Sequence, residues 1–192
     1  MAYLSKDALH RMEFAHLGRN VRISTRAALY DTARMHLGDN SRIDDFCVVS
    51  GRVETGRNVH FAPFCLVAGG RPGVFIQDFA GLAYRVSVFD QSDDYSGATM
   101  TNPTVPALYK TETLAPVHIG RHVIIGASAI VVPGVDLAEG TAVGAGSLVL
   151  KSTEAWSVVV GTPARRLRAR SRRLLEQEAA YLHAERTAAE RG

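Results

Sequence analysis

The sequence predicts an all-β fold in which short strands wind into a triangular coil. The first observation is a period of six, because seventeen of eighteen hexads between Leu17 and Val149 begin with an apolar residue. The second observation is that the residue four places further on is small in every hexad but one, where it is Arg71. This period fits neither an amphipathic helix nor a long alternating strand, whereas it suits a short strand and a turn repeated many times.

The period also predicts how the strands assemble. A strand this short cannot bury its own face, so successive strands must stack on copies of themselves. Three hexads close a triangle of eighteen residues, and the eighteen hexads therefore make about six coils. With coils about 4.8 Å apart, the prism would be roughly 30 Å long. Asparagine or glycine often stands three places after the apolar residue, where a tight corner needs a left-handed backbone; examples are Asn20, Asn40, Asn58 and Gly134.

Both ends of the chain depart from the hexad pattern. Residues 1–16 are expected to form an N-terminal helical cap, with a short helix from Ser5 to Phe14 and Ser5 as its N-cap. Residues 17–163 are expected to form the β-helix. Residues 164–192 are expected to form a C-terminal α-helix, because the stretch from Arg168 to Glu190 is rich in Ala, Leu, Glu and Arg.

One long insertion, residues 90–117, interrupts the coils. It contains no hexads, and its sequence is polar and rich in turn-forming residues. It also carries apolar and aromatic side chains, namely Tyr95, Met100, Val105 and Tyr109. Long loops in compact repeats are usually functional or disordered. We expect an ordered arm at a subunit interface.

Composition limits the function classes. The formal net charge is only +3, which does not indicate a nucleic-acid partner. The N-terminus has no apolar signal region, and no run is long enough to span a membrane, so we expect a cytoplasmic protein without membrane insertion. Cys47 and Cys65 stand eighteen residues apart at small inward positions. Buried free thiols on adjacent coils are expected, with a disulfide as the alternative.

Several motifs in the second half of the chain resemble one family. The segment from Ile76 to Arg168 is similar to the hexapeptide-repeat acyltransferases of the galactoside and maltose O-acetyltransferase type, and the loop resembles a subgroup associated with polysaccharide biosynthesis. The matching runs are Val117-His118-Ile119-Gly120, Val131-Val132-Pro133-Gly134-Val135, Val143-Gly144-Ala145-Gly146-Ser147 and Val160-Gly161-Thr162-Pro163-Ala164-Arg165. The resemblance implies a left-handed parallel β-helix and an acetyl-CoA donor. It also implies a sugar or sugar-nucleotide acceptor with a hydroxyl or amino group, and a homotrimer with its active sites in the grooves between subunits.

The same resemblance implies a donor site. Ala127 and Ala145 match positions whose backbone lines the slot for the pantetheine arm of coenzyme A. Lys151, Arg165 and Arg168 match the end of the slot that receives the phosphates, where cations are needed. The alternative for the arginine run is the solvated start of a helix. No metal ion is implied.

The catalytic base of the family is missing from this chain. The family usually has a histidine where the chain enters the long loop, and here that place holds Asp93, followed by Asp94. An ordinary aspartate is a weak base for a sugar hydroxyl unless burial or a like charge raises its pKa. The alternative is that the two aspartates form a loop turn or an interface salt bridge.

His60 is a second candidate for the base. It directly precedes the inward-facing Phe61, so it should point outward from a flat face. Its hexad lies on a different face from the strand that enters the loop, but His60 and Asp93 of neighbouring subunits could meet across a trimer groove. Such a pair would orient the imidazole. An exposed or interface histidine is the alternative.

Tyr95 and Asn102 of the loop are candidate acceptor-binding residues, and packing of the loop against a neighbouring subunit is the alternative. The function expected from the sequence is acyl transfer from acetyl-CoA to a hydroxyl or amino group of a sugar. Two other functions stay open: a non-catalytic or CoA-binding β-helix protein, and a metal enzyme of the γ-carbonic-anhydrase type. The second would need three histidines around zinc, and Ala127-Ser128 follow Ile125-Gly126 where such a histidine would stand.

Overall fold

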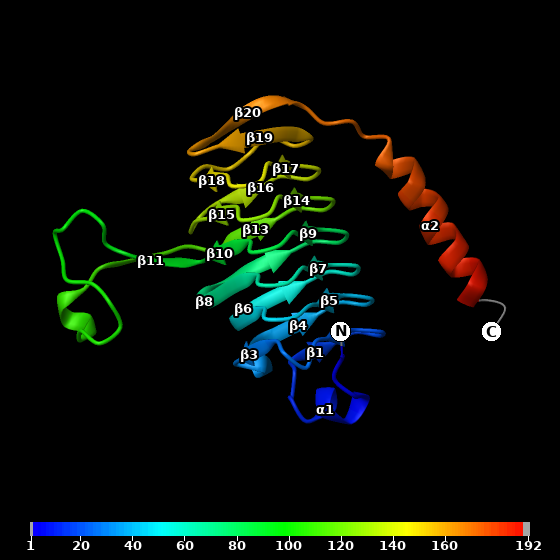
Figure 1. The fold of residues 1–192 in the computed structure, drawn as a ribbon, viewed down its shortest axis with the longest axis horizontal. Coiled ribbons are helices and arrows are strands. Elements are labelled where there is room, and N and C mark those ends of the chain that lie inside the picture. Colours follow the sequence, from blue (N-terminus) through cyan, green and yellow to red (C-terminus); the bar gives the residue numbers. More distant parts are fainter. Residues whose placement is uncertain (1, 190–192) are drawn as a thin grey trace.

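The computed structural model describes residues 2–189 and contains a triangular prism of stacked strands. An arm projects from one side of the prism and a long helix lies along the other (Figure 1). The first face of the prism is a sheet of seven parallel strands, with an antiparallel eighth, β20 (Ala164–Ala169), at its end. In spatial order the seven are β2 (Arg22–Ile23), β5 (Arg42–Ile43), β7 (His60–Phe61), β9 (Gly81–Leu82), β14 (Ile124–Ile125), β17 (Ala142–Val143) and β19 (Ser157–Gly161).

The other two faces share two long strands that turn a corner of the prism, β6 (Val48–Thr55) and β8 (Leu66–Ile76). The second face contains the first halves of these strands together with β3 (Ala28–Tyr30), β10 (Ser87–Phe89), β15 (Ile130–Val131) and β18 (Leu148–Val149). The third face contains their second halves together with β1 (His16–Leu17), β4 (Met35–Leu37), β13 (Val117–Ile119) and β16 (Asp136–Leu137).

The hexad pattern and the core agree closely. The residues that open the hexads are buried, except for Leu17, Leu29 and Thr55, which are partly exposed. Most of the small residues of the pattern, such as Cys47 and Ala129, are also buried and fill the corners of the core, whereas Ala33 is exposed. Both cysteines are free and buried, as predicted. The first face continues into β19, so the prism has a partial seventh coil beyond the six that the hexads predict.

Two rows of corner residues matter for the site. The first corner, between the first and second faces, is a ladder of stacked turns. One backbone N–H of each turn after the first bonds to a carbonyl of the turn on the adjacent coil. Its turns are Thr25–Arg26, Asp45–Phe46, Pro63–Phe64, Tyr84–Arg85, Ala127–Ser128 and Ala145–Gly146. The third corner, between the third and first faces, is built the same way. Its left-handed residues are Asn20, Asn40, Asn58, Phe79, His122, Gly140 and Trp156.

The N-terminal helix caps the prism but is shorter than predicted. Helix α1 (Lys6–His10) begins after Ser5, whose Oγ accepts a hydrogen bond from the Ala8 amide, so the predicted N-cap is confirmed. The helix ends before Phe14 because residues 14–15 approach the first coil, where the Ala15 amide bonds to the Thr32 carbonyl. Thr32 begins η1 (Thr32–Arg34), a 3₁₀ turn between β3 and β4.

The C-terminal region differs from the prediction of a helix over residues 164–192. Residues 164–169 form β20, which folds back on β19 through the Gly161–Ala164 turn and closes the end of the prism. Helix α2 (Leu174–Ala189) begins only after this hairpin, and residues 190–192 lie outside the described part of the chain. Composition favoured a helix throughout, but the exposed edge of β19 offers backbone hydrogen bonds that a helix at residues 164–169 could not use.

Helix α2 lies along the third corner. Glu178 forms an ion pair with Arg121 and a hydrogen bond with His122 Nε2 at 3.0 Å, and Glu185 forms an ion pair with Arg57 at 2.5 Å. Tyr181 stands edge-on to Phe79 with ring centroids 6.1 Å apart. The helix is therefore held mainly by polar contacts with four successive coils. Within residues 2–189 no helix is long and apolar enough to cross a membrane.

The arm is an ordered antiparallel ribbon. Strands β11 (Gln91–Asp93) and β12 (Glu112–Leu114) pair with Asp93 opposite Glu112, and η2 (Ala107–Tyr109) lies beyond them. The buried Asp90 anchors its base, because Oδ2 accepts hydrogen bonds from the amides of Gly70 and Gly73 at 2.7 and 2.6 Å. Val117 already belongs to β13, so the insertion ends one residue earlier than predicted.

Candidate active site

The residues predicted to bind coenzyme A follow the first corner to the end of the prism. Ala127 and Ala145 stand on adjacent coils, where the Gly146 amide donates a hydrogen bond to the Ala127 carbonyl at 2.8 Å. Lys151 and Arg165 line one hollow of about 320 Å³ next to the last coil, together with Glu154 and Arg166. Arg166 is neutralised by Glu154 at 3.2 Å. Lys151 and Arg165 have no ion pair within residues 2–189.

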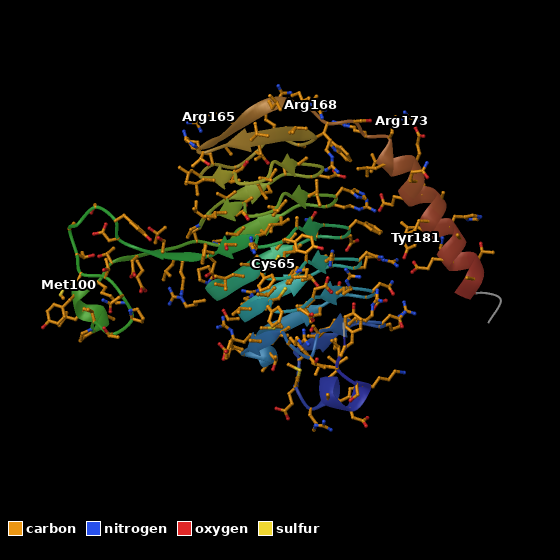
Figure 2. All side chains as sticks on the ribbon, viewed as in Figure 1. Cys65, Met100, Arg165, Arg168, Arg173 and Tyr181 are labelled. Carbon is orange, nitrogen blue, oxygen red and sulfur yellow. The ribbon has the colours of Figure 1, made fainter. Side chains whose placement is uncertain are left out.

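Arg168 lies on the same end of the prism but outside that hollow. Figure 2 shows Arg165 and Arg168 on the terminal hairpin, with Arg173 near the start of α2. Two arginines of the same run have structural roles. Arg170 donates hydrogen bonds to the carbonyls of His122 and Gly140, and burial lowers the pKa of its guanidinium. Arg172 stacks over Trp156.

The two aspartates of the arm have different surroundings. Asp94 accepts hydrogen bonds from the amides of Ser96 and Thr99 at 2.8 and 3.0 Å. Bonds from Ser96, first its side chain and then its backbone, together with those from Thr99, lower the pKa of Asp94 from 3.8 to about 2. Asp93 accepts one hydrogen bond, from the Asn102 amide to Oδ2 at 3.1 Å. Its Oδ1 has no recorded partner within residues 2–189, so Asp93 is the carboxylate with free acceptor capacity.

The predicted acceptor-binding residues lie in the same arm. The side chain of Tyr95 is 93% exposed. Asn102 adopts a left-handed backbone, and its Oδ1 accepts hydrogen bonds from the Thr104 amide and hydroxyl. Figure 2 shows Met100 at the outer part of the arm, away from the prism. The arm therefore brings Asp93, Asp94, Tyr95 and Asn102 together.

His60 lies on β7 of the first face, and its side chain is 39% exposed. Its Nε2 is 2.8 Å from Oδ2 of Asp44, a carboxylate whose side chain is only 2% exposed. Arg42 Nη2 lies 2.9 Å from the same oxygen and 2.9 Å from His60 Nε2. A buried carboxylate needs donors to offset its desolvation. In the tautomer that carries the proton on Nε2, His60 donates to Asp44 and Nδ1 is left as an acceptor, whereas in the other tautomer Nε2 accepts from Arg42.

The sequence predicted the outward direction of His60 but not its contacts with Asp44 and Arg42. The signal was present, because Arg42 precedes His60 by eighteen residues and the two are paired neighbours on adjacent strands. Asp44 follows two residues after Arg42, at the edge of the first corner. His60 and Asp93 belong to different sheets, and no contact joins them within the described chain. Their meeting across a groove between subunits stays a prediction.

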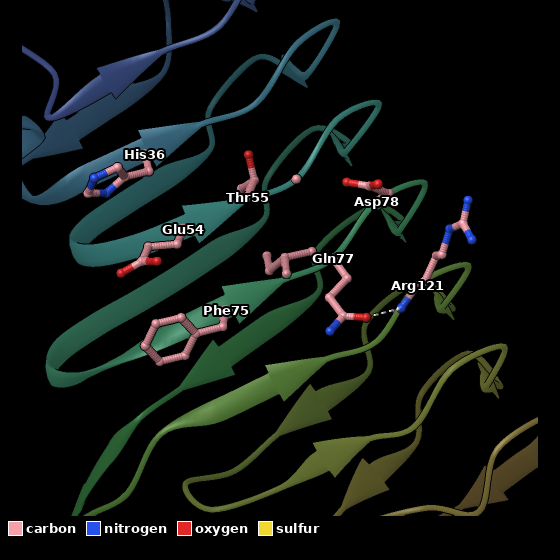
Figure 3. Close-up of a pocket in the computed structure, with 9 residues that line it drawn as sticks. His36, Glu54, Thr55, Phe75, Gln77, Asp78 and Arg121 are labelled. Carbon is pink, nitrogen blue, oxygen red and sulfur yellow. Dashed lines mark hydrogen bonds between the residues drawn. The ribbon is translucent and has the colours of Figure 1, made fainter. Parts of the chain in front are cut away.

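A separate hollow lies on the third face and holds none of the predicted site residues. Figure 3 shows His36, Glu54 and Phe75 along the face, with Gln77, Asp78 and Arg121 toward the third corner. Gln77 accepts a hydrogen bond from the Arg121 amide at 3.1 Å. Within residues 2–189 no group of three or more His, Cys, Asp or Glu side chains could hold a metal ion.

Comparison with known proteins gives consistent results. No protein-family model matches the chain. The dTDP-4-amino-4,6-dideoxy-D-glucose acyltransferase of Escherichia coli is 42% identical over 184 residues, which cover 94% of this chain and 95% of that enzyme. The galactoside O-acetyltransferase of Lactococcus lactis is 32% identical over 115 residues, covering 56% of this chain and 51% of that enzyme.

Solved structures show the same relationship. AntD, an N-acyltransferase from Bacillus cereus in complex with dTDP and 3-hydroxybutyryl-CoA, superposes with a TM-score of 0.94 at 39% identity, covering 96% of this chain and 98% of that one. A variant of AntD in which a serine is replaced by alanine, in complex with dTDP-4-amino-4,6-dideoxyglucose and coenzyme A, has a TM-score of 0.93 at 40% identity. The match covers 95% of this chain and 98% of that one. The full-length match to the E. coli enzyme and the shared β-helix lead to one conclusion: the chain belongs to the hexapeptide-repeat acyltransferases.

Proposed function

We propose that this enzyme transfers an acyl group from acyl-CoA to the amino group of a nucleotide-linked amino sugar, with dTDP-4-amino-4,6-dideoxyglucose as the first candidate. The observation that carries the proposal is Asp93, a carboxylate with free acceptor capacity where the resemblance to O-acetyltransferases leads one to expect a histidine. A neutral amine is a better nucleophile than a hydroxyl and needs less help from a base. The E. coli enzyme and AntD, whose names describe this kind of acceptor, support the same choice.

The donor is proposed to lie along the first corner. Lys151 and Arg165, with Arg168 nearby, supply the cations that the phosphates of coenzyme A require at the end of the prism. The small side chains of Ala145 and Ala127 leave room for the pantetheine arm on the next coils down. This path brings the thioester to the level of Tyr84, one coil beyond Ala127 and about 4.8 Å from it along the prism. A short acyl group, with acetyl as the first candidate, is proposed.

The reaction is proposed to begin with the amine held by Asp93, whose free oxygen accepts an N–H hydrogen bond and so aims the nitrogen lone pair. The nitrogen attacks the thioester carbonyl carbon, so that a C–N bond forms and the C–S bond breaks. Coenzyme A leaves as a thiolate and receives the proton that the nitrogen loses. His60, with Nδ1 free to accept and Asp44 fixing its ring, is the proposed carrier of that proton.

The site is proposed to be shared between subunits of a homotrimer. His60 lies on the first face and Asp93 on the arm beyond the second face, so one chain cannot supply both to one substrate without a large movement. A neighbouring subunit related by threefold symmetry can supply the second residue without such a movement. Tyr95 and Asn102, on the same arm as Asp93, would then face the acceptor or the neighbouring prism.

The direct test compares two acceptors that differ at one atom. Release of the coenzyme A thiol from acetyl-CoA is measured with dTDP-4-amino-4,6-dideoxyglucose and with dTDP-6-deoxyglucose, which has a hydroxyl at the same carbon. The proposal predicts rapid thiol release with the amino sugar and at least about 100-fold less with the hydroxyl sugar, because a hydroxyl is a weaker nucleophile than a neutral amine and must lose its proton during the attack. Equal rates, or faster release with the hydroxyl sugar, would contradict it.

A further inference from the structure

Three aromatic side chains stand exposed in a row on the first corner. Phe46, Phe64 and Tyr84 occupy three successive coils, and their side chains are 47%, 51% and 60% exposed. Phe46 and Phe64 are the only exposed phenylalanines within residues 2–189. Their rings are stacked with centroids 5.0 Å apart. Apolar rings held in solvent on a rigid corner are typical of a binding surface.

Arg85, which follows Tyr84 in its turn, differs from the other arginines that lie over phenylalanine rings. Arg85 lies over Phe64 at 5.8 Å and has no carboxylate within 4 Å in the described part of the chain. Each of the other arginines over a phenylalanine ring has a carboxylate partner: Arg26 pairs with Asp45, Arg52 with Glu54, Arg57 with Glu185 and Arg121 with Glu178. Arg85 is thus an exposed cation with no internal charge to neutralise it.

The row continues the line of the proposed donor path. Ser128 bonds to Tyr84, Arg85 to Pro63 and Phe64 to Asp45, so one hydrogen-bonded ladder joins the Ala127 turn to the aromatic turns. If the thioester lies at the level of Tyr84, an acceptor must extend from there toward Phe64 and Phe46, because coenzyme A occupies the opposite direction. Phe64 is one coil from Tyr84 and Phe46 is two, or about 4.8 and roughly 10 Å along the prism.

We infer that Arg85, Phe64 and Phe46 form the subsite for the nucleoside diphosphate of the acceptor. Arg85 binds the diphosphate, for which a free guanidinium is well suited. The exposed edges of the Phe64 and Phe46 rings hold the pyrimidine base by aromatic contact, since the ring faces are covered by each other, by Arg26 and by Arg85. The sugar then lies beside Tyr84 and His60, where its amine reaches the thioester. This inference rests on the proposed function for the direction of the acceptor, and it adds the residues that recognise the nucleotide.

The test separates base recognition from phosphate recognition. Binding of dTDP and of thymidine to the full-length enzyme is measured by calorimetry, with thymidine determined by competition. Phe64→Leu keeps an apolar side chain but removes the ring, so it should weaken both ligands by about tenfold or more. Arg85→Gln should weaken dTDP to a similar extent and leave thymidine unchanged. KM for acyl-CoA should stay within about twofold in both variants, since the donor lies on other coils.

The chain offers a matched control in the pair Phe75 and Arg52. This pair has the same stacked geometry, with a distance of 4.9 Å, but lies on the third face, and Arg52 is paired with Glu54. Phe75→Leu and Arg52→Gln should leave dTDP and thymidine binding unchanged. The oligomeric state of every variant is measured by light scattering, because exposed rings at a corner could instead belong to a contact between subunits.

Each outcome has a distinct meaning. Wild-type affinity for dTDP in Phe64→Leu and Arg85→Gln would overturn the subsite while leaving the proposed reaction intact. Loss of dTDP binding only together with dissociation of the oligomer would also overturn it and assign the row to a subunit interface. Binding of dTDP that depends on Phe64 and Arg85, without acylation of the amino sugar, would uphold the subsite and overturn the proposed function. No dTDP binding by the wild-type enzyme would overturn both.

Discussion

Asp93 and Asp94 are neighbours in sequence, yet their hydrogen bonds give them different capacities. Asp94 is occupied by Ser96 and Thr99, which lower its pKa to about 2, so it stays ionised and shapes the arm at any pH above about 4. That contribution is lost only as the pH falls from 3.8 toward 2. Asp93 keeps a free oxygen for a substrate. The sequence predicted both carboxylates as site residues but could not distinguish them, because the distinction depends on how the loop folds back.

The first prediction follows from this difference. Asp93→Asn should lower kcat/KM for the amino sugar by about 100-fold, because the charged acceptor for the amine is removed while the shape is kept. Asp94→Asn should have a much smaller effect on kcat and act mainly through the order of the arm. Steady-state kinetics of both variants provide the measurement, with Glu176→Gln, an exposed carboxylate on α2, as the control. A larger loss of kcat in Asp94→Asn than in Asp93→Asn would reverse the assignment.

The second prediction concerns Asp44 as a positioning residue for His60. Asp44→Asn should lower kcat by about 10- to 100-fold with little change in KM for acyl-CoA, since the ring loses its fixed tautomer. Nitrogen-15 NMR of His60 should show a single tautomer protonated on Nε2 in the wild-type enzyme and a mixture in the variant. An unchanged tautomer with an unchanged kcat would show that the buried ion pair serves only the fold.

At the scale of elements, the strands were predictable and the connections were less so. The apolar period located each strand within one or two residues, because the inward side chain of every hexad must be buried. The hairpin of β19 and β20 was not predictable from composition, since Arg165, Leu167 and Arg168 are good helix formers and only the open edge of β19 makes a strand favourable. Helix α2 contacts the prism mainly through Glu178, Tyr181 and Glu185.

The third prediction tests this polar docking of α2. The Glu178→Gln, Glu185→Gln double variant should raise hydrogen exchange of the α2 amides by about fivefold, while exchange in the prism core stays unchanged. The hydrogen bond from Arg57 lowers the pKa of Glu185 below its ordinary value of 4.5. The wild-type ion pair is therefore complete above pH 4.5 and weakens as the pH falls through the lowered pKa. Lowering the pH should therefore mimic the variant. Equal α2 exchange in wild type and variant at neutral pH would mean that other contacts hold the helix.

For the whole molecule, the prism follows from the repeat because each coil is specified by the same local rule. The proposed groove between subunits does not follow from that rule. It would depend on outward residues such as His60 and on the arm, which lie outside the apolar pattern. The resemblance to acyltransferases pointed to residues of the prism and the arm, whereas the contact of His60 with Asp44 emerged only from the stacking of coils.

The fourth prediction addresses the shared site. His60→Gln and Asp93→Asn chains, each of low activity alone, are expressed together so that mixed trimers form. If each site takes His60 from one chain and Asp93 from its neighbour, about a quarter of the sites in random mixtures are intact, and about a quarter of wild-type activity should return. Activity no higher than that of the separate variants would place both residues within a single subunit's site.

The enzyme is proposed to form an amide on a nucleotide-linked amino sugar. The most direct measurement follows the wild-type enzyme with acetyl-CoA and dTDP-4-amino-4,6-dideoxyglucose, recording free thiol and the mass of the sugar product in the same reaction. One acetylated nucleotide sugar is expected for each thiol released, with the acetyl group on nitrogen. Thiol release without an acetylated sugar, or no release at saturating concentrations of both substrates, would contradict it.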